Sequence, residues 1–128
     1  EKAEDFVLAT GITTSIRDFV KMSFKQAGVE VEFKGHGVEE KAYVVSFENS
    51  DYKLEIGQEI VAVDPRYFRP TEVDLLLGDA TKAKEKLGWT LKYDLDALVK
   101  DMIDSDLRLM TKEKYLKDGG YEVKNYFE

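Results

Sequence analysis

The sequence contains no cysteine and only one histidine, His36, among its 128 residues. The lack of cysteine excludes disulfides and thiolate metal sites, and a single imidazole excludes any centre that needs two. No apolar run exceeds four residues, so the sequence predicts no transmembrane helix. The charged opening from Glu1 to Asp5 lacks the basic start and apolar stretch of a secretory signal, and we therefore expect a cytoplasmic location.

Basic residues are outnumbered as well, because 19 Lys and Arg face 26 Asp and Glu, a formal net charge of -7. A charge of this sign argues against a general binder of nucleic acid or of anionic membranes. The apolar share of 43% and the aromatic share of 12% supply enough bulky surface for a packed core despite 35% charged residues. The length favours one domain over residues 1–128.

The first half of the chain has the patterning of an α/β fold. A buried strand is expected at Phe6 to Ala9. Ser15 and Asp18 have the spacing of a capping box, so a helix should begin there and end at Gly28, which supplies a left-handed stop. Alternating or apolar runs then predict three strands, at Val29 to Phe33, Ala42 to Phe47 and Glu59 to Val63.

The second half predicts two further helices. The shorter runs from about Ala80 to Leu87, capped by Asp79 and ended by Gly88. The longer runs from about Leu95 to Met110 behind an Asp94 cap.

The two ends of the chain are less regular. The chain has no initiator Met and runs almost at once into a predicted strand, as a piece of a longer chain would. At the other end, Gly119 and Gly120 interrupt the tail, so we expect poor order after about residue 111.

Two glycines flank the only histidine, in Gly35-His-Gly37. As a dinucleotide fingerprint this pattern fails, because no third glycine follows and two carboxylates stand where a pyrophosphate needs bare amides. We interpret it as a surface turn, with His36 an exposed loop side chain. Neither a catalytic triad nor a metal cluster can be assembled, and the most prominent acids are expected in solvent: Glu39, Glu40, Asp101, Asp104 and Asp106.

Both prolines lie five residues apart in the densest cluster of candidate binding residues. They stiffen an irregular stretch that presents Arg66, Arg69 and Glu72. An arginine fork pairs two phosphate oxygens, and a nearby carboxylate accepts hydrogen bonds from a sugar diol, so Arg69 with Glu72 suits a sugar nucleotide. The alternative is a structural salt bridge between these two side chains, and the spacing alone leaves both interpretations open.

Two stretches, Arg69-Pro-Thr-Glu-Val73 and Gly78-Asp-Ala-Thr-Lys-Ala-Lys-Glu-Lys-Leu-Gly-Trp89, resemble the C-terminal part of extended short-chain dehydrogenase/reductases that act on nucleotide sugars. The chain is most similar to the GDP-mannose 4,6-dehydratase family, which carries Val63-Asp-Pro-Arg-Tyr-Phe-Arg-Pro70 almost unchanged. The resemblance weakens only after about Met110, and it extends to three further motifs: Asp5-Phe-Val-Leu-Ala-Thr-Gly11, Ser15-Ile-Arg-Asp-Phe19 and Gly35-His-Gly-Val-Glu-Glu-Lys41.

The resemblance implies a small α/β substrate-binding lobe whose partner, a Rossmann domain, is absent from this chain. It implies that Arg69 holds the diphosphate of GDP-mannose and Glu72 a ribose hydroxyl, with Arg66 a weaker candidate for the same site. It also implies a homo-oligomeric parent enzyme. Four residues of the second half are interpreted as scaffold: Asp79, Lys82, Leu87 and Trp89.

The residues that drive catalysis in such enzymes have no counterpart here. The resemblance implies that NADP binds the missing N-terminal domain, together with a Thr or Ser, a Glu and a Tyr-x-x-x-Lys pair. The nearest pattern, Tyr121-Glu-Val-Lys124, has the wrong spacing. We therefore assign no catalytic, cofactor-binding or metal-binding residue and expect the chain alone to be inactive.

The implied parent reaction is a lyase step of GDP-fucose biosynthesis. It converts GDP-mannose to GDP-4-keto-6-deoxy-mannose through an NADP-dependent internal redox cycle. Two alternatives remain: the substrate lobe of another nucleotide-sugar dehydratase, epimerase or reductase, or a non-catalytic folding and assembly module.

Overall fold

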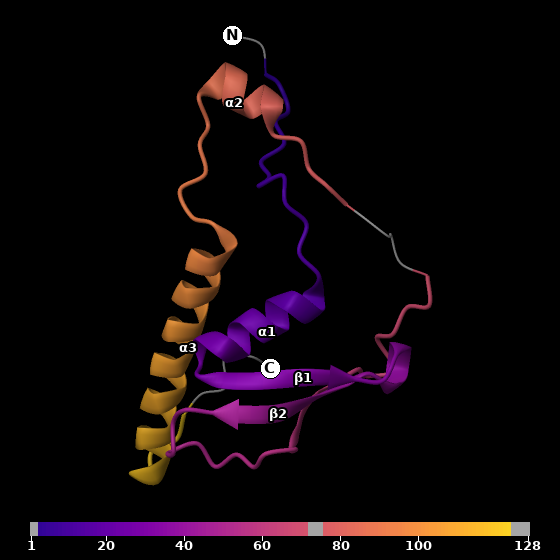
Figure 1. The fold of residues 1–128 in the computed structure, drawn as a ribbon. Coiled ribbons are helices and arrows are strands. Elements are labelled where there is room, and N and C mark those ends of the chain that lie inside the picture. The colour runs from indigo at the N-terminus through magenta and orange to yellow at the C-terminus, as the bar shows by residue number, and fades with distance from the viewer. Residues whose placement is uncertain (1–2, 72–75, 124–128) are drawn as a thin grey trace.

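The computed structural model describes residues 3–71 and 76–123. Within these ranges the chain forms a small α/β fold around one antiparallel sheet in the order β1-β2-β3 (Figure 1). The predicted α/β class is thereby confirmed. The elements are α1 (Ile16–Gln26), β1 (Val29–Lys34), the 3-10 helix η1 (Gly37–Glu39), β2 (Lys41–Phe47), β3 (Glu59–Ala62), α2 (Thr81–Leu87) and α3 (Leu95–Asp118).

Helix α1 begins and ends where the sequence predicts. The Ser15 hydroxyl oxygen accepts a hydrogen bond from the Asp18 amide at 3.0 Å, which satisfies one of the open donors of the first turn. At the other end Gly28 has a φ of +75° and its amide donates to the Lys25 carbonyl at 2.9 Å. The helix packs against β1 and against α3 (Figure 1).

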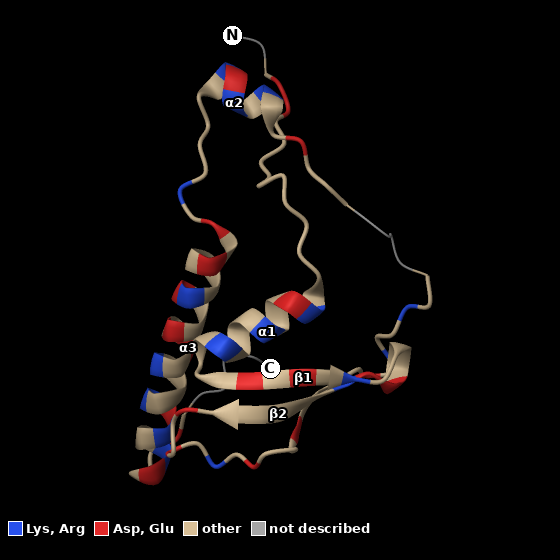
Figure 2. Ribbon diagram, in the orientation of Figure 1, with Lys and Arg blue, Asp and Glu red and all other residues tan. Residues whose placement is uncertain are grey.

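The three predicted strands are confirmed, and they bury small side chains. On the central strand β2, Ala42 and Val44 are almost completely buried, and Val29 begins β1 in the same state. Acidic residues alternate with less exposed ones along β1, where Glu30 and Glu32 are exposed (Figure 2). The buried hydrophobic side chains of the described residues are Val29, Ala42, Val44, Ala80, Ala83 and Val99.

Helix α3 starts as predicted but is longer than predicted. The Asp94 carboxylate accepts the Ala97 amide at 2.8 Å, which caps the first turn. The helix ends at Asp118 instead of Met110, so residues 112–118 are helical. The physical reason is that no helix breaker stands before Gly119, whose amide closes the helix on the Tyr115 carbonyl at 3.1 Å. No helix in the described ranges is long and apolar enough to cross a membrane.

Helix α2 is capped by its own flanking residues. The Asp79 carboxylate accepts the amide of Thr81 at 2.9 Å and its hydroxyl at 2.6 Å, and Gly88 ends the helix with a left-handed φ of +63°. The predicted stop at Gly88 is confirmed, whereas the N-cap residue is Ala80 and not Asp79, which lies one residue earlier and binds Thr81. Trp89 is half-buried, as scaffold would be, but Leu87 is 60% exposed and does not pack as expected.

The buried strand predicted at Phe6 to Ala9 does not form. The segment is extended but belongs to no sheet of the described chain, and Val7 and Leu8 are 54% and 61% exposed. It lies beside α2 instead, where Lys82 donates to the Asp5 carbonyl at 2.9 Å (Figure 1). The predicted strand and its burial are therefore both wrong, because among the described residues no strand pairs with this segment.

One long-range hydrogen bond joins this segment to the chain that follows the sheet. The Thr13 hydroxyl donates to the Leu76 carbonyl at 3.2 Å, across a separation of 63 residues. Close by, a Cβ added at Gly78 would lie 2.5 Å from the Cβ of Ala9, so the two backbones approach too closely for any larger residue at position 78.

Candidate functional site

The loop that follows β3 forms an open hollow of about 490 Å³. It is lined by Val63, Arg66, Tyr67, Phe68 and Arg69, and we call it the arginine hollow. The structure therefore brings together Arg66 and Arg69, the two cationic side chains that the sequence singled out. Glu72, the third candidate binding residue, lies outside the described residues.

The loop turns at Asp64, and its sequence explains the turn. The Asp64 carboxylate accepts the Arg66 amide at 2.9 Å, and the Asp64 carbonyl accepts the Tyr67 amide at 3.0 Å. Pro65 stands between them with a fixed φ, which suits the second position of such a turn. The turn directs the next residues, Arg66 to Arg69, along the wall of the hollow.

The side chain of Arg66 folds back onto the same acid. Its Nε lies 3.2 Å from Oδ1 and 3.1 Å from Oδ2 of Asp64, and its Nη2 lies 2.6 Å from Oδ2. The guanidinium carbon also lies 5.6 Å from the centre of the Tyr67 ring. The hydrogen bonds from Arg66 hold the pKa of Asp64 below its ordinary value, and those to Asp64 raise the pKa of Arg66.

The turn at Gly35-His-Gly37, which we call the glycine turn, contacts the loop of the arginine hollow. A Cβ added at Gly37 would lie 3.5 Å from the Cζ of Phe68, so the turn and the loop are in van der Waals reach. At Gly35 φ is +88°, and a Cβ there would lie 2.4 Å from the Glu39 carbonyl oxygen. The interpretation as a surface turn is confirmed, with His36 exposed.

Two of the acids expected in solvent are instead held by partners. Arg17 donates to the Glu40 carboxylate through Nε at 2.9 Å and through Nη2, and the Glu40 side chain is only 19% exposed. Asp104 is half-buried and accepts from Gln26 at 3.2 Å and from the i−4 residue Lys100. The contacts with Arg17 and Gln26 were not predicted because both residues lie on α1, far in the sequence from the acids they bind, whereas Lys100 lies one helical turn before Asp104.

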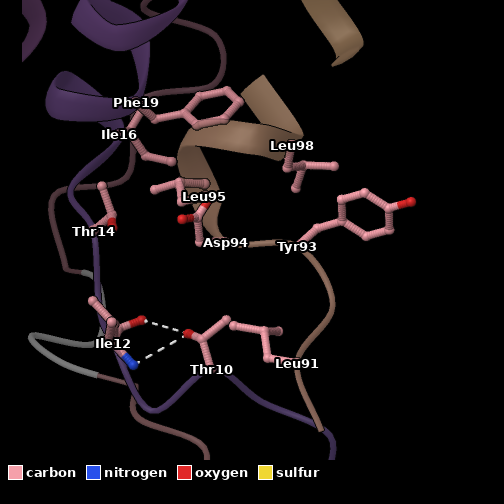
Figure 3. Close-up of a pocket in the computed structure, with 10 residues that line it drawn as sticks. All are labelled: Thr10, Ile12, Thr14, Ile16, Phe19, Leu91, Tyr93, Asp94, Leu95 and Leu98. Carbon is pink, nitrogen blue, oxygen red and sulfur yellow. Dashed lines mark hydrogen bonds between the residues drawn. The ribbon is translucent and has the colours of Figure 1, made fainter. Parts of the chain in front are cut away.

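A second concavity, of about 440 Å³, lies where the chain before α1 meets the start of α3 (Figure 3). We call it the apolar groove. Its lining residues are Thr10, Ile12, Thr14, Ile16, Phe19, Leu91, Tyr93, Asp94, Leu95 and Leu98. Asp94 is its one ionisable acid, and that carboxylate is occupied by the cap of α3. Hydrophobic and hydroxyl groups suit packing against an apolar surface more than acid or base chemistry.

The sequence analysis did not predict the apolar groove. The structure reveals the groove through large apolar side chains that remain exposed, such as Ile12 at 76% and Tyr93 at 70%. In the described ranges no group of three or more His, Cys, Asp or Glu side chains could hold a metal ion.

Comparison with known proteins agrees with the motifs of this site. Residues 1–102 match the family model described as GDP-mannose 4,6 dehydratase. The GDP-mannose 4,6-dehydratase of Yersinia enterocolitica is 45% identical over 125 residues, which cover 96% of this chain and 33% of that protein. A Vibrio cholerae protein of the same name is 43% identical over 124 residues, with the same coverage. The Drosophila melanogaster GDP-mannose 4,6 dehydratase is 46% identical over 112 residues, covering 88% of this chain and 26% of that protein.

These matches agree on one family. The chain belongs to the GDP-mannose 4,6-dehydratase family. It spans about a third of the length of the curated relatives and matches their C-terminal part. The family resemblance of the sequence motifs is thereby confirmed.

Proposed function

We propose that this chain is the nucleotide-sugar-binding part of a GDP-mannose 4,6-dehydratase and that the arginine hollow receives the nucleotide end of the substrate. One observation carries the proposal: Arg66 and Arg69 line a single open hollow on a loop that is stiffened by Pro65 and Pro70. Guanidinium groups on a rigid loop suit a diphosphate, because their planar donors match its oxygens.

We give Arg69 and Glu72 different roles. Arg69 pairs with the diphosphate, and Glu72 accepts a hydrogen bond from a ribose hydroxyl. The contribution to the reaction is orientation, since holding the nucleotide end places the hexose for chemistry carried out elsewhere in the enzyme. The overall reaction is the conversion of GDP-mannose to GDP-4-keto-6-deoxy-mannose.

We assign NADP to the rest of the enzyme. Gly35-His-Gly37 is the glycine pair nearest in pattern to a pyrophosphate-binding turn. It does not fit that role, because no third glycine follows and the carboxylates Glu39 and Glu40 come next in the chain. The turn also closes on itself at Gly35, where a Cβ would lie 2.4 Å from the Glu39 carbonyl oxygen.

The large accessible surface area of the chain favours its burial against a large partner. Its accessible surface is 11065 Å², whereas a compact monomer of 14.7 kDa exposes about 6,900 Å². The excess is several times the area that one side of a standard protein interface buries. We propose that the Rossmann part of the enzyme covers the apolar groove and the exposed segment at Val7 and Leu8, and that the whole enzyme is a homo-oligomer.

Ligand titration tests the proposed function. We expect the chain to bind GDP-mannose weakly and in preference to UDP- and dTDP-sugars, and to show no turnover with added NADP. Arg69→Gln should weaken GDP-mannose binding at least about tenfold, because a charge-assisted pair is lost. Arg108→Gln on α3 is the matched control, since it removes the same charge outside the hollow.

Two results would redirect the proposal. Tighter binding of a UDP- or dTDP-sugar would favour another nucleotide-sugar dehydratase, epimerase or reductase. The other alternative is a folding and assembly module, and the large exposed surface of the chain is the observation in its favour. Unchanged substrate affinity after Arg69→Gln in the full-length enzyme would support that module and contradict the binding role.

A further inference from the structure

Asp64 contacts the loop that forms the arginine hollow, and the proposed function gives this residue no role. Asp64 begins the loop and contacts Arg66 through both its backbone and its side chain. We propose that Asp64 is a positioning residue of the arginine hollow, and that Arg66 acts through Asp64 as part of the loop scaffold and not as a direct phosphate ligand. The proposal rests on the proposed function for the identity of the ligand.

The geometry of Arg66 is the first argument. The guanidinium edge formed by Nε and Nη2 faces the Asp64 carboxylate, with contacts of 3.1 and 2.6 Å to Oδ2. That edge is one that could otherwise form a paired contact with a phosphate. The guanidinium carbon also lies 5.6 Å from the centre of the Tyr67 ring, within the range of a cation–π contact. Arg66 is thus engaged by two neighbours within the loop itself.

The connection to the rest of the hollow is the second argument. The Asp64 carbonyl accepts the Tyr67 amide at 3.0 Å, so the same residue fixes the turn through its main chain and its side chain. The Asp64 side chain is 38% exposed, against 79% for Arg66, which places the acid at the base of the pair. Because Phe68 and Arg69 follow directly, the direction in which they leave the turn depends on Asp64.

Charge gives the third argument and the means to test it. A carboxylate beside a site for an anionic diphosphate opposes binding by simple Coulomb repulsion. Removal of the Asp64 charge should therefore strengthen anion binding if charge alone matters, and weaken it if Asp64 positions the loop. The two expectations have opposite signs.

The experiment compares Asp64→Asn, Arg66→Gln and the double variant by calorimetric titration with GDP-mannose and with GDP. Each single variant should weaken binding by roughly two- to fivefold, the range for an exposed ion pair. The double variant should bind no more weakly than the weaker single variant, because the two residues act as one unit. Asp106→Asn, an exposed acid on α3, is the control and should bind like the unsubstituted chain. Unchanged or tighter binding by Asp64→Asn together with weaker binding by Arg66→Gln would overturn the proposal, because Arg66 would then contact the phosphates itself.

Amide hydrogen exchange without ligand provides a second readout. Residues 66–69 should exchange faster in Asp64→Asn and in Arg66→Gln than in the unsubstituted chain, with Asp106→Asn unchanged. Unaltered exchange in both variants would overturn the positioning role even where GDP-mannose binds. Faster exchange in a chain that binds no GDP-mannose would support the positioning role and count against the proposed function.

Discussion

Arg17 on α1 donates two hydrogen bonds to Glu40, the residue that joins η1 to β2. The Arg17 guanidinium also lies 5.7 Å from the centre of the Phe33 ring on β1. One side chain therefore joins the first turn of α1 to β1 and to the residue that precedes β2. Because the glycine turn backs Phe68, the pair belongs to the support of the arginine hollow.

Arg17→Ala should destabilise the chain by about 1–2 kcal/mol, because Glu40 would keep a poorly exposed charge without its partner. Urea unfolding followed by circular dichroism measures the change. Lys34→Ala is the matched control, since Lys34 and Glu32 form an ion pair with both side chains more than half exposed, and its loss should cost little. Equal destabilisation by the two variants would contradict a special role for the Arg17–Glu40 pair.

Gly35→Ala should destabilise the glycine turn more than Gly57→Ala destabilises its own turn. Both residues have a φ between +85° and +88°, so both variants carry the backbone cost of about 1–2 kcal/mol. Only at position 35 does the added Cβ meet an atom, the Glu39 carbonyl oxygen at 2.4 Å, whereas nothing lies within 4 Å at position 57. The difference between the two unfolding free energies isolates the clash, and equal values would show that the turn relaxes without cost.

Stability should fall with acid in part through Asp104. Hydrogen bonds from Lys100 and Gln26 lower the pKa of Asp104 in the folded chain. The carboxylate therefore stabilises the fold above its unfolded pKa of about 3.9, and this contribution is lost as the pH falls through the lower folded value. Asp104→Asn should flatten the stability curve below about pH 4. Asp106→Asn on the same helix is the control, and an identical acid dependence in the two variants would contradict the prediction.

The apolar groove should tolerate polar substitution in the isolated chain but not in the whole enzyme. Ile12→Ser removes a side chain that is 76% exposed, so the unfolding free energy of this chain should change by less than about 0.5 kcal/mol. Val99→Ala, at a position 3% exposed, should cost about 1–2 kcal/mol in either context. In the full-length enzyme Ile12→Ser should lower the melting temperature, and an unchanged value would count against burial of the groove there.

Local rules predicted the parts of the fold that local interactions determine. The caps at Ser15 and Asp94 and the left-handed stops at Gly28 and Gly88 follow from the chemistry of adjacent residues, and all four are present. Arg66 and Arg69 also lie on one irregular stretch after β3, as the two prolines predicted.

The remaining features depend on contacts that periodicity does not contain. The segment at Phe6 to Ala9 has the composition of a buried strand, yet its burial requires a neighbouring strand that the described residues do not provide. Arg17 and Gln26, which bind Glu40 and Asp104, both come from α1, and the apolar groove forms only when residues near position 12 meet those near position 93. Such long-range contacts arise only in the folded chain.

The hydrogen bond from Thr13 to Leu76 has a topological consequence. The polypeptide leaves the neighbourhood of Leu76 at Thr13 and returns to it after 63 residues, so α1 and the sheet lie within one closed excursion of the chain. Loop-closure cost rises only slowly with the length enclosed. A change in the length of this excursion should therefore perturb its closing point little.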